Sequence, residues 1–98
     1  FPEAERRNQL RLVAASDGRE GAITVQQDVD LYNTLLDAGA RVEHELKTGR
    51  QAWVHVATGA VKLNGIELTG GDGAAVSVES KIELEAVEPA EVLVFDLG

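Results

Sequence analysis

The stretch of residues 52–68 constrains the fold of this 98-residue chain more than any other part of it. Apolar and polar residues alternate along the stretch, which is the period of a half-buried β-strand. Thr58-Gly59 and Asn64-Gly65 interrupt the alternation, and glycine and asparagine tolerate the positive φ angles that tight hairpin turns require. The stretch therefore predicts short consecutive strands joined by hairpin turns at these two places.

The same alternation recurs on both sides of the central stretch, with glycine-rich turns between the segments. Residues 31–36 also fit a short helix, because their leucines match both periods. Pro89 is expected to break the chain, and the continuous apolar run after it is typical of a strand covered on both sides. Outside the central stretch, strands are predicted at residues 9–15, 22–26, 31–36, 40–46, 74–78, 81–87 and 92–95. About nine or ten short strands predict an all-β antiparallel sandwich or barrel.

The chain is long enough for one hydrophobic core and too short for two. Residues 1–8 are polar and are interpreted as a lead-in segment, and residues 9–98 as a single domain. The start lacks an initiator methionine and an apolar signal core, which suggests a segment cut from a longer chain. The chain has no cysteine, which excludes disulfides and thiolate chemistry and suits a cytoplasmic location.

A net charge of −8 makes nucleic acid and anionic membranes poor partners, because so acidic a surface repels polyanions. The acidic residues are densest near the end of the chain, and a solvated outer face explains them. No stretch of the sequence is long and apolar enough to span a bilayer. Serine and histidine residues occur, but nothing places them together in the context of a nucleophile elbow.

Several short segments occur in a distinctive order and spacing. They are Leu-Arg-Leu-Val-Ala-Ala-Ser-Asp-Gly at 10–18, Gln-Asp-Val-Asp-Leu-Tyr at 27–32, the segment 39–44, Trp-Val-His-Val at 53–56 with Gly59 and Asn64-Gly65, and Val-Phe-Asp-Leu at 94–97. In this order they resemble the C-terminal cupin half of the pirin-like bicupins, the family that includes the quercetinase-type proteins. The resemblance covers almost the whole chain from Leu10 onward.

This resemblance implies a β-jelly-roll, the cupin fold. It also implies that the N-terminal cupin of two-domain members holds an iron-like divalent metal, and that cupin is not in this sequence. The expected partner is therefore the N-terminal cupin of the same parent chain, or a second subunit. The parent is expected to be a metal-dependent, quercetinase-like dioxygenase that acts on flavonol-like phenols.

The resemblance also indicates where a metal site would lie in this half. A metal-bearing cupin supplies two histidines two residues apart, a carboxylate from the next strand and a third histidine beyond the second glycine loop. Here His44 and Leu46 stand where the histidine pair would be. Ala52 stands at the carboxylate position, and Val76 replaces the third histidine. Because a divalent ion needs three or four protein ligands, we expect no metal, no other cofactor and no catalytic residue in this domain.

His44 without co-ligands has two interpretations. It is an interior histidine that is hydrogen-bonded to a neighbouring group, as buried polar groups usually are. Alternatively, it lines an apolar pocket and offers one polar contact to a small aromatic ligand. The candidate interior pocket comprises His44, Leu46, Ala52, Val54 and Val76.

Trp53 and His55 share the face of their strand opposite to Val54 and Val56. If that face is exposed, a tryptophan beside a histidine is a candidate interface for another domain or subunit. Local packing under a loop is the alternative interpretation, and the sequence leaves both open.

The sequence therefore favours a non-catalytic C-terminal cupin domain that packs against and supports a metal-bearing N-terminal cupin. The alternative is a small-molecule-binding cupin module that uses the interior of the barrel, with His44 as its polar contact. We do not expect this domain to be an enzyme by itself.

Overall fold

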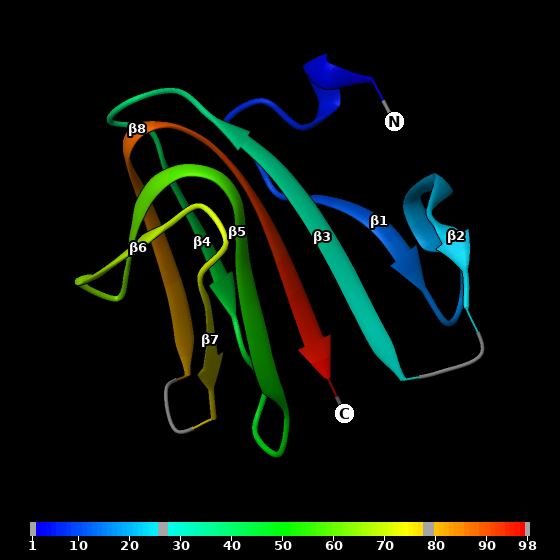
Figure 1. Ribbon diagram of the computed structural model, residues 1–98. Coiled ribbons are helices and arrows are strands. Elements are labelled where there is room, and N and C mark those ends of the chain that lie inside the picture. Colours follow the sequence, from blue (N-terminus) through cyan, green and yellow to red (C-terminus); the bar gives the residue numbers. More distant parts are fainter. Residues whose placement is uncertain (1, 26–27, 78–79, 98) are drawn as a thin grey trace.

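The computed structural model of the protein describes residues 2–25, 28–77 and 80–97. These residues form eight strands and two short 3₁₀ helices (Figure 1), so the expected all-β fold is confirmed. In chain order the elements are η1 (Glu3–Glu5), β1 (Arg11–Ala15), η2 (Arg19–Gly21), β2 (Ile23–Thr24), β3 (Val29–Leu36), β4 (Arg41–Glu45), β5 (Gln51–Leu63), β6 (Ile66–Thr69), β7 (Gly73–Val76) and β8 (Lys81–Leu97).

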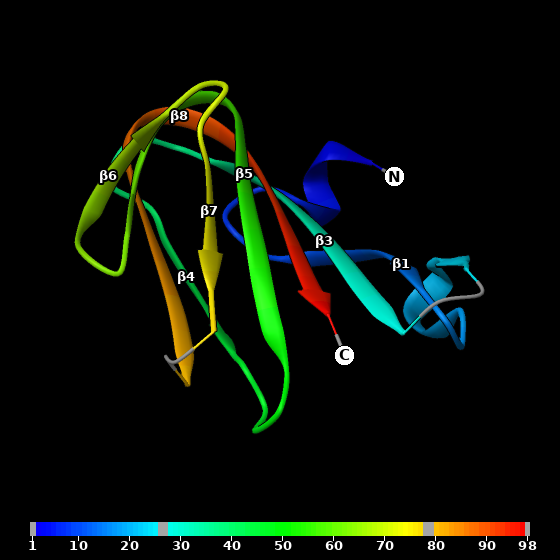
Figure 2. The same ribbon diagram turned by 60° about the horizontal axis from the view of Figure 1, so that its bottom comes forward.

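Two long antiparallel strands, β5 and β8, are shared by both layers of the sandwich. The first half of β5 and the second half of β8 lie in a layer with β7 on one side and β3, β1 and β2 on the other. The second half of β5 and the first half of β8 lie in the other layer, between β6 and β4. Figures 1 and 2 show both long strands arching together from one layer to the other.

The arch lies at Gly59 of β5 and Pro89 of β8. The register between the two strands shifts from Val56 onward, which is the signature of β-bulges. Gly59 has a φ of +85°, and Pro89, which has no backbone N–H to donate, is tolerated at such an irregularity. The expectations that the chain would turn at Gly59 and break at Pro89 are therefore wrong, because both strands bend and continue. Each bend joins two predicted strands into one, and this leaves eight strands in the described residues.

The structure also decides two other expectations, the turn at Asn64-Gly65 and the conformation of residues 31–36. Asn64 and Gly65 have φ angles of +48° and +87° and form the hairpin turn between β5 and β6. Residues 31–36 form the greater part of β3, so the helical alternative is wrong. Among the named strands, only β1 and β2 pair in parallel. The predicted strands 22–26 and 74–78 end at positions outside the described residues.

The core lies between the two layers and is built from the inward side chains of both. Alternation sends every second residue of β5 and β8 inward, so the core is mainly small and branched aliphatic. Its buried residues are Leu36, Val42, Leu46, Ala52, Val54, Val56, Val61, Leu63, Val76, Ile82, Leu84, Ala86, Ala90, Val92 and Val94. No helix in the described part of the chain is long and apolar enough to cross a membrane.

The described part of the lead-in segment, residues 2–8, is pinned to the end of β3. The backbone N–H of Leu35 donates to the carbonyl of Arg6 at 2.8 Å, and the N–H of Asn8 donates to the carbonyl of Leu35 at 2.6 Å. The Asn8 side-chain amide also donates to Asp37 at 2.9 Å. The segment therefore continues the edge of the first layer and does not extend away from it.

We predict that Gly59→Ala destabilises the fold more than Gly39→Ala. Both glycines have a positive φ, which costs a non-glycine residue about 1 kcal/mol. A Cβ at residue 59 would lie 2.2 Å from the Pro89 carbonyl oxygen, whereas a Cβ at residue 39 meets nothing within 4 Å. Overpacking of this kind adds about 1–3 kcal/mol. Urea denaturation of the two variants measures the difference, and equal losses of stability would contradict the role given to the bend.

Candidate functional site

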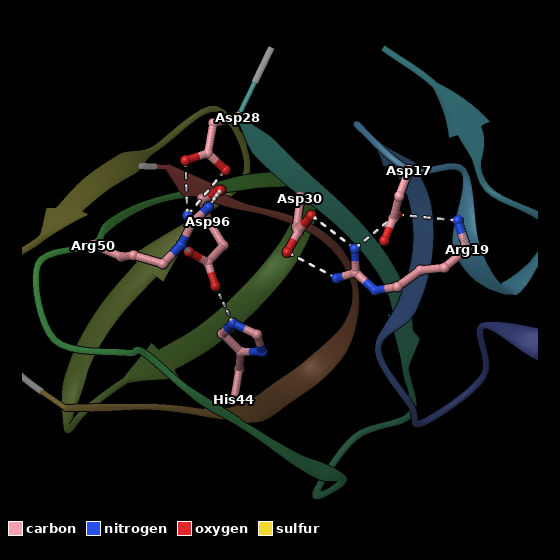
Figure 3. A network of polar contacts seen from close by, with 7 residues as sticks. All are labelled: Asp17, Arg19, Asp28, Asp30, His44, Arg50 and Asp96. Atoms are coloured by element: carbon pink, nitrogen blue, oxygen red, sulfur yellow. Dashed lines mark hydrogen bonds and ion pairs between the residues drawn. The ribbon is translucent and has the colours of Figure 1, made fainter. Parts of the chain in front are cut away.

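Asp96 is a buried carboxylate at the open end of the sandwich, away from the bends. It is 4% exposed and lies on the inward face of β8, two residues beyond Val94. His44 reaches it from β4 in the opposite layer, with its Nε2 atom 2.8 Å from Asp96 Oδ2 (Figure 3). Because an ionised carboxylate can only accept, the His44 Nε2 atom carries the proton in this hydrogen bond. The two layers are therefore joined by this bond at their open end.

Arg50 approaches the second oxygen of the same carboxylate. It lies at the end of the turn between β4 and β5, and its Nε donates to Asp96 Oδ1 at 2.5 Å. Its Nη2 donates to the Asp96 backbone carbonyl at 2.9 Å, and its Nη1 to both oxygens of Asp28 at 3.0 and 3.2 Å. Hydrogen bonds to Asp96 and then to Asp28 raise the pKa of the Arg50 guanidinium above its usual value. Arg50 is therefore a permanent cation against the buried carboxylate.

A second group of charges lies next to this network. Arg19 forms a fork with Asp30, at 2.8 and 3.3 Å, and donates to Asp17 at 3.0 Å (Figure 3). The Tyr32 ring packs against the His44 imidazole with the ring centroids 4.8 Å apart. Burial, and then the negative charge of Asp30, raises the pKa of the Tyr32 hydroxyl above its usual value.

These two groups surround a small polar cavity of about 180 Å³ at the mouth of the sandwich. Its lining combines both signs of charge with the two rings, and each arginine in it is already paired with carboxylates. The lining residues are Arg19, Asp30, Tyr32, His44, Glu45, Lys47, Arg50 and Asp96.

The residues of the candidate interior pocket comprise four buried aliphatic side chains and one polar side chain. Leu46, Ala52, Val54 and Val76 are between 0 and 7% exposed and pack together in the core. The His44 side chain, in contrast, forms a hydrogen bond with the buried Asp96 carboxylate.

Trp53 and His55 lie on the outside of the first layer, where they form part of an apolar surface. Trp53 is 42% exposed and stands opposite Phe95 in the register of β5 and β8, as His55 stands opposite Leu93. A shallow hollow of about 360 Å³ is lined by Trp53, His55, Leu93, Phe95 and Leu97. We call these residues, with the adjacent Leu31, the outer apolar face.

Sequence reasoning missed Asp96, which is the hydrogen-bond partner of His44, and Arg50, which is the second partner of Asp96. Asp96 had a readable signal, because alternation places it on the same face as Val92 and Val94, where an acidic residue is unexpected. Arg50 had none, because a turn residue has no strand periodicity to give the direction of its side chain.

The two-layered sandwich with its shared, bent strands is a cupin fold. The chain belongs to the quercetinase C-terminal cupin domain family, whose sequence model matches residues 12–97.

One protein sequence and two crystal structures illustrate the relationship. Quercetin 2,3-dioxygenase of Escherichia coli (strain K12) is 36% identical over 87 residues, which are 89% of this chain and 38% of that protein. The crystal structure of YhhW from Escherichia coli superposes with a TM-score of 0.90 at 34% identity, covering 93% of this chain and 39% of that one. The bacterial pirin YhhW in complex with nickel(II) gives a TM-score of 0.87 at 35% identity, covering 90% and 38%. The chain thus spans about two fifths of the length of the relatives that it matches.

The residues at the expected metal position do not fit a metal ion. The His44 Nε2 atom faces Asp96, and the same carboxylate accepts a hydrogen bond from Arg50. Leu46, Ala52 and Val76, which stand at the other ligand positions, are apolar core residues. Among the residues that the structure describes, no three histidine, cysteine or acidic side chains are grouped to hold an ion.

We predict that Arg50→Met destabilises the domain by about 3–5 kcal/mol, because it leaves the buried Asp96 carboxylate without its cation. The matched control is Arg19→Met. Its ion pair with Asp30 is more exposed, and pairs of that kind contribute below about 1 kcal/mol. Urea denaturation of both variants gives the comparison, and an Arg50→Met loss no larger than that of Arg19→Met would contradict the role given to the network.

Proposed function

We propose that this chain is a non-catalytic C-terminal cupin domain of a pirin-like bicupin. In this proposal it supports an N-terminal cupin that carries an iron-like divalent metal, in a parent that acts as a quercetinase-like dioxygenase on flavonol-like phenols. The observation that carries the proposal is the position of Asp96 between His44 and Arg50. The carboxylate that accepts the hydrogen bond from His44 is already paired with a guanidinium.

The charge balance of this network supports a structural role. Asp96 is 4% exposed, so its charge needs a partner, and Arg50 supplies a cation that cannot dissociate as a metal ion can. The interior beyond His44 is filled with aliphatic side chains, which suits a rigid support better than a reaction chamber.

The similar proteins support the part of the proposal that concerns the rest of the parent chain. The chain matches 38–39% of their lengths, which leaves room for a second cupin. The nickel(II) complex of the bacterial pirin YhhW supports placing a divalent metal in the parent protein. The cytoplasmic location that suits the cysteine-free sequence also belongs to this proposal.

Calorimetric titration with ferrous, nickel, copper and zinc ions tests the proposal. We expect no tight stoichiometric binding by the 98-residue chain, because an ion at His44 would have to displace Arg50 from Asp96 and would find the apolar Leu46, Ala52 and Val76 at the other ligand positions. YhhW titrated with nickel(II) is the positive control. One equivalent of tightly bound metal in this chain would overturn the proposal.

A small-molecule-binding module is the second candidate, and the cavity beside Tyr32 and His44 is the observation that favours it. A cavity of about 180 Å³ suits a single aromatic ring, with the His44 imidazole and the Tyr32 hydroxyl as polar contacts. A thermal-shift screen of phenols and benzoates with the wild type and His44→Ala tests it. Stabilisation of the wild type alone would favour this function, whereas equal shifts, or none, would reject it.

A further inference from the structure

The outer apolar face is continuous across three neighbouring strands of the first layer. Leu31 of β3 stands opposite Phe95 of β8, and Phe95 stands opposite Trp53 of β5. Leu93 lies next to this row, opposite His55. Because residues paired in this way project from the same side of a sheet, the side chains form a single surface. This surface faces away from the core between the layers.

The apolar run at residues 92–95 is typical of a strand that is covered on both sides. The structure covers only one side of it. Val92 and Val94 are 0% exposed and pack in the core, while Leu93 and Phe95 remain partly exposed on the outer apolar face. The strand β8 therefore carries more apolar side chains than this domain alone buries.

Trp53 is held in position on this face by the backbone of β7. Its indole ring lies so close to Gly73 that a Cβ there would be 2.3 Å from the Trp53 Cζ2 atom. The ring lies over bare backbone while 42% of the residue stays exposed. A large aromatic side chain fixed in this way loses little conformational freedom when a partner covers it.

The lead-in segment reaches the rim of the same face. The Arg6 guanidinium donates to Asn33 at 2.7 Å and lies 3.6 Å from Glu91. Asn33 stands opposite Leu93 in the register, so this polar cluster borders the apolar surface. A domain that precedes this segment in the chain would emerge beside the outer apolar face.

The acidic residues of the first half of β8, such as Glu83 and Glu85, lie in the other layer and so do not interrupt the outer apolar face.

We propose that the outer apolar face is the docking surface for the N-terminal cupin of the same parent chain, with Trp53 and Phe95 at its centre. This inference rests on the function proposed above, because it requires a parent with a second cupin. It adds which face of this domain is covered, and by what.

Thiol accessibility in the longer parent chain tests the inference, because the present chain contributes no cysteine of its own. His55→Cys places a thiol on the outer apolar face and leaves Trp53 intact. We expect this thiol to react with a maleimide at least about tenfold more slowly in the parent than in the 98-residue chain, since interface centres exclude water. Adding Trp53→Ser to the parent should restore fast labelling, read by mass spectrometry of the tryptic peptide.

Ile66→Cys is the matched control, because Ile66 is 68% exposed on β6 in the other layer and should label equally fast in both chains. Equal labelling of His55→Cys in parent and isolated chain would overturn the inference. So would protection that appears in the isolated chain as its concentration rises, since the occupant would then be a second copy. Neither result changes the outcome of the metal titration, which tests the proposed function independently.

Discussion

The pairing of β5 with β8 organises the whole domain, because both strands run through both layers. Their register begins at Gln51 and Leu97 and continues past the bends to Leu63 and Leu84. Every other named strand except β1 and β2 pairs directly with one of these two. The fold therefore depends on two strands turning a corner together, which requires the close backbone approach at Gly59 and Pro89.

At the opposite end of the sandwich β5 and β8 do not bend from one layer to the other, and charged side chains link the layers there. His44 comes from one layer, Asp96 from the other, and Arg50 from the turn that connects them. The carboxylate is held on both oxygens, so neither layer can move apart without exposing or unpairing it. His44, the one polar residue among the expected ligand positions, thus hydrogen-bonds across the two sheets.

Most of the fold could be predicted from alternation, since period-two patterning specifies strands and their inward faces. The error at Thr58-Gly59 has a physical reason. A type I′ hairpin turn needs positive φ at both central residues, which Asn64 and Gly65 adopt and a β-branched threonine resists. Gly59 alone has positive φ, so the strand bulges and continues.

The candidate site was less predictable. The ligand positions filled by Leu46, Ala52 and Val76 could be read from the sequence, because they follow the spacing of strands. Arg50 could not, since its partners are Asp28 and Asp96, which only the closed fold brings together. The exposure of Trp53 could not be read either, because alternation gives the face of a residue and not what covers that face.

The long register of β5 and β8 also has a consequence for how the chain reaches its native state. Strand pairs so distant in sequence require large loops to close before their contacts repay the lost entropy. Domains dominated by such pairs fold on the scale of milliseconds to seconds. The network at the open end joins residues 28, 44, 50 and 96, so it can assemble only after both layers have met. Its formation should be among the last events of folding.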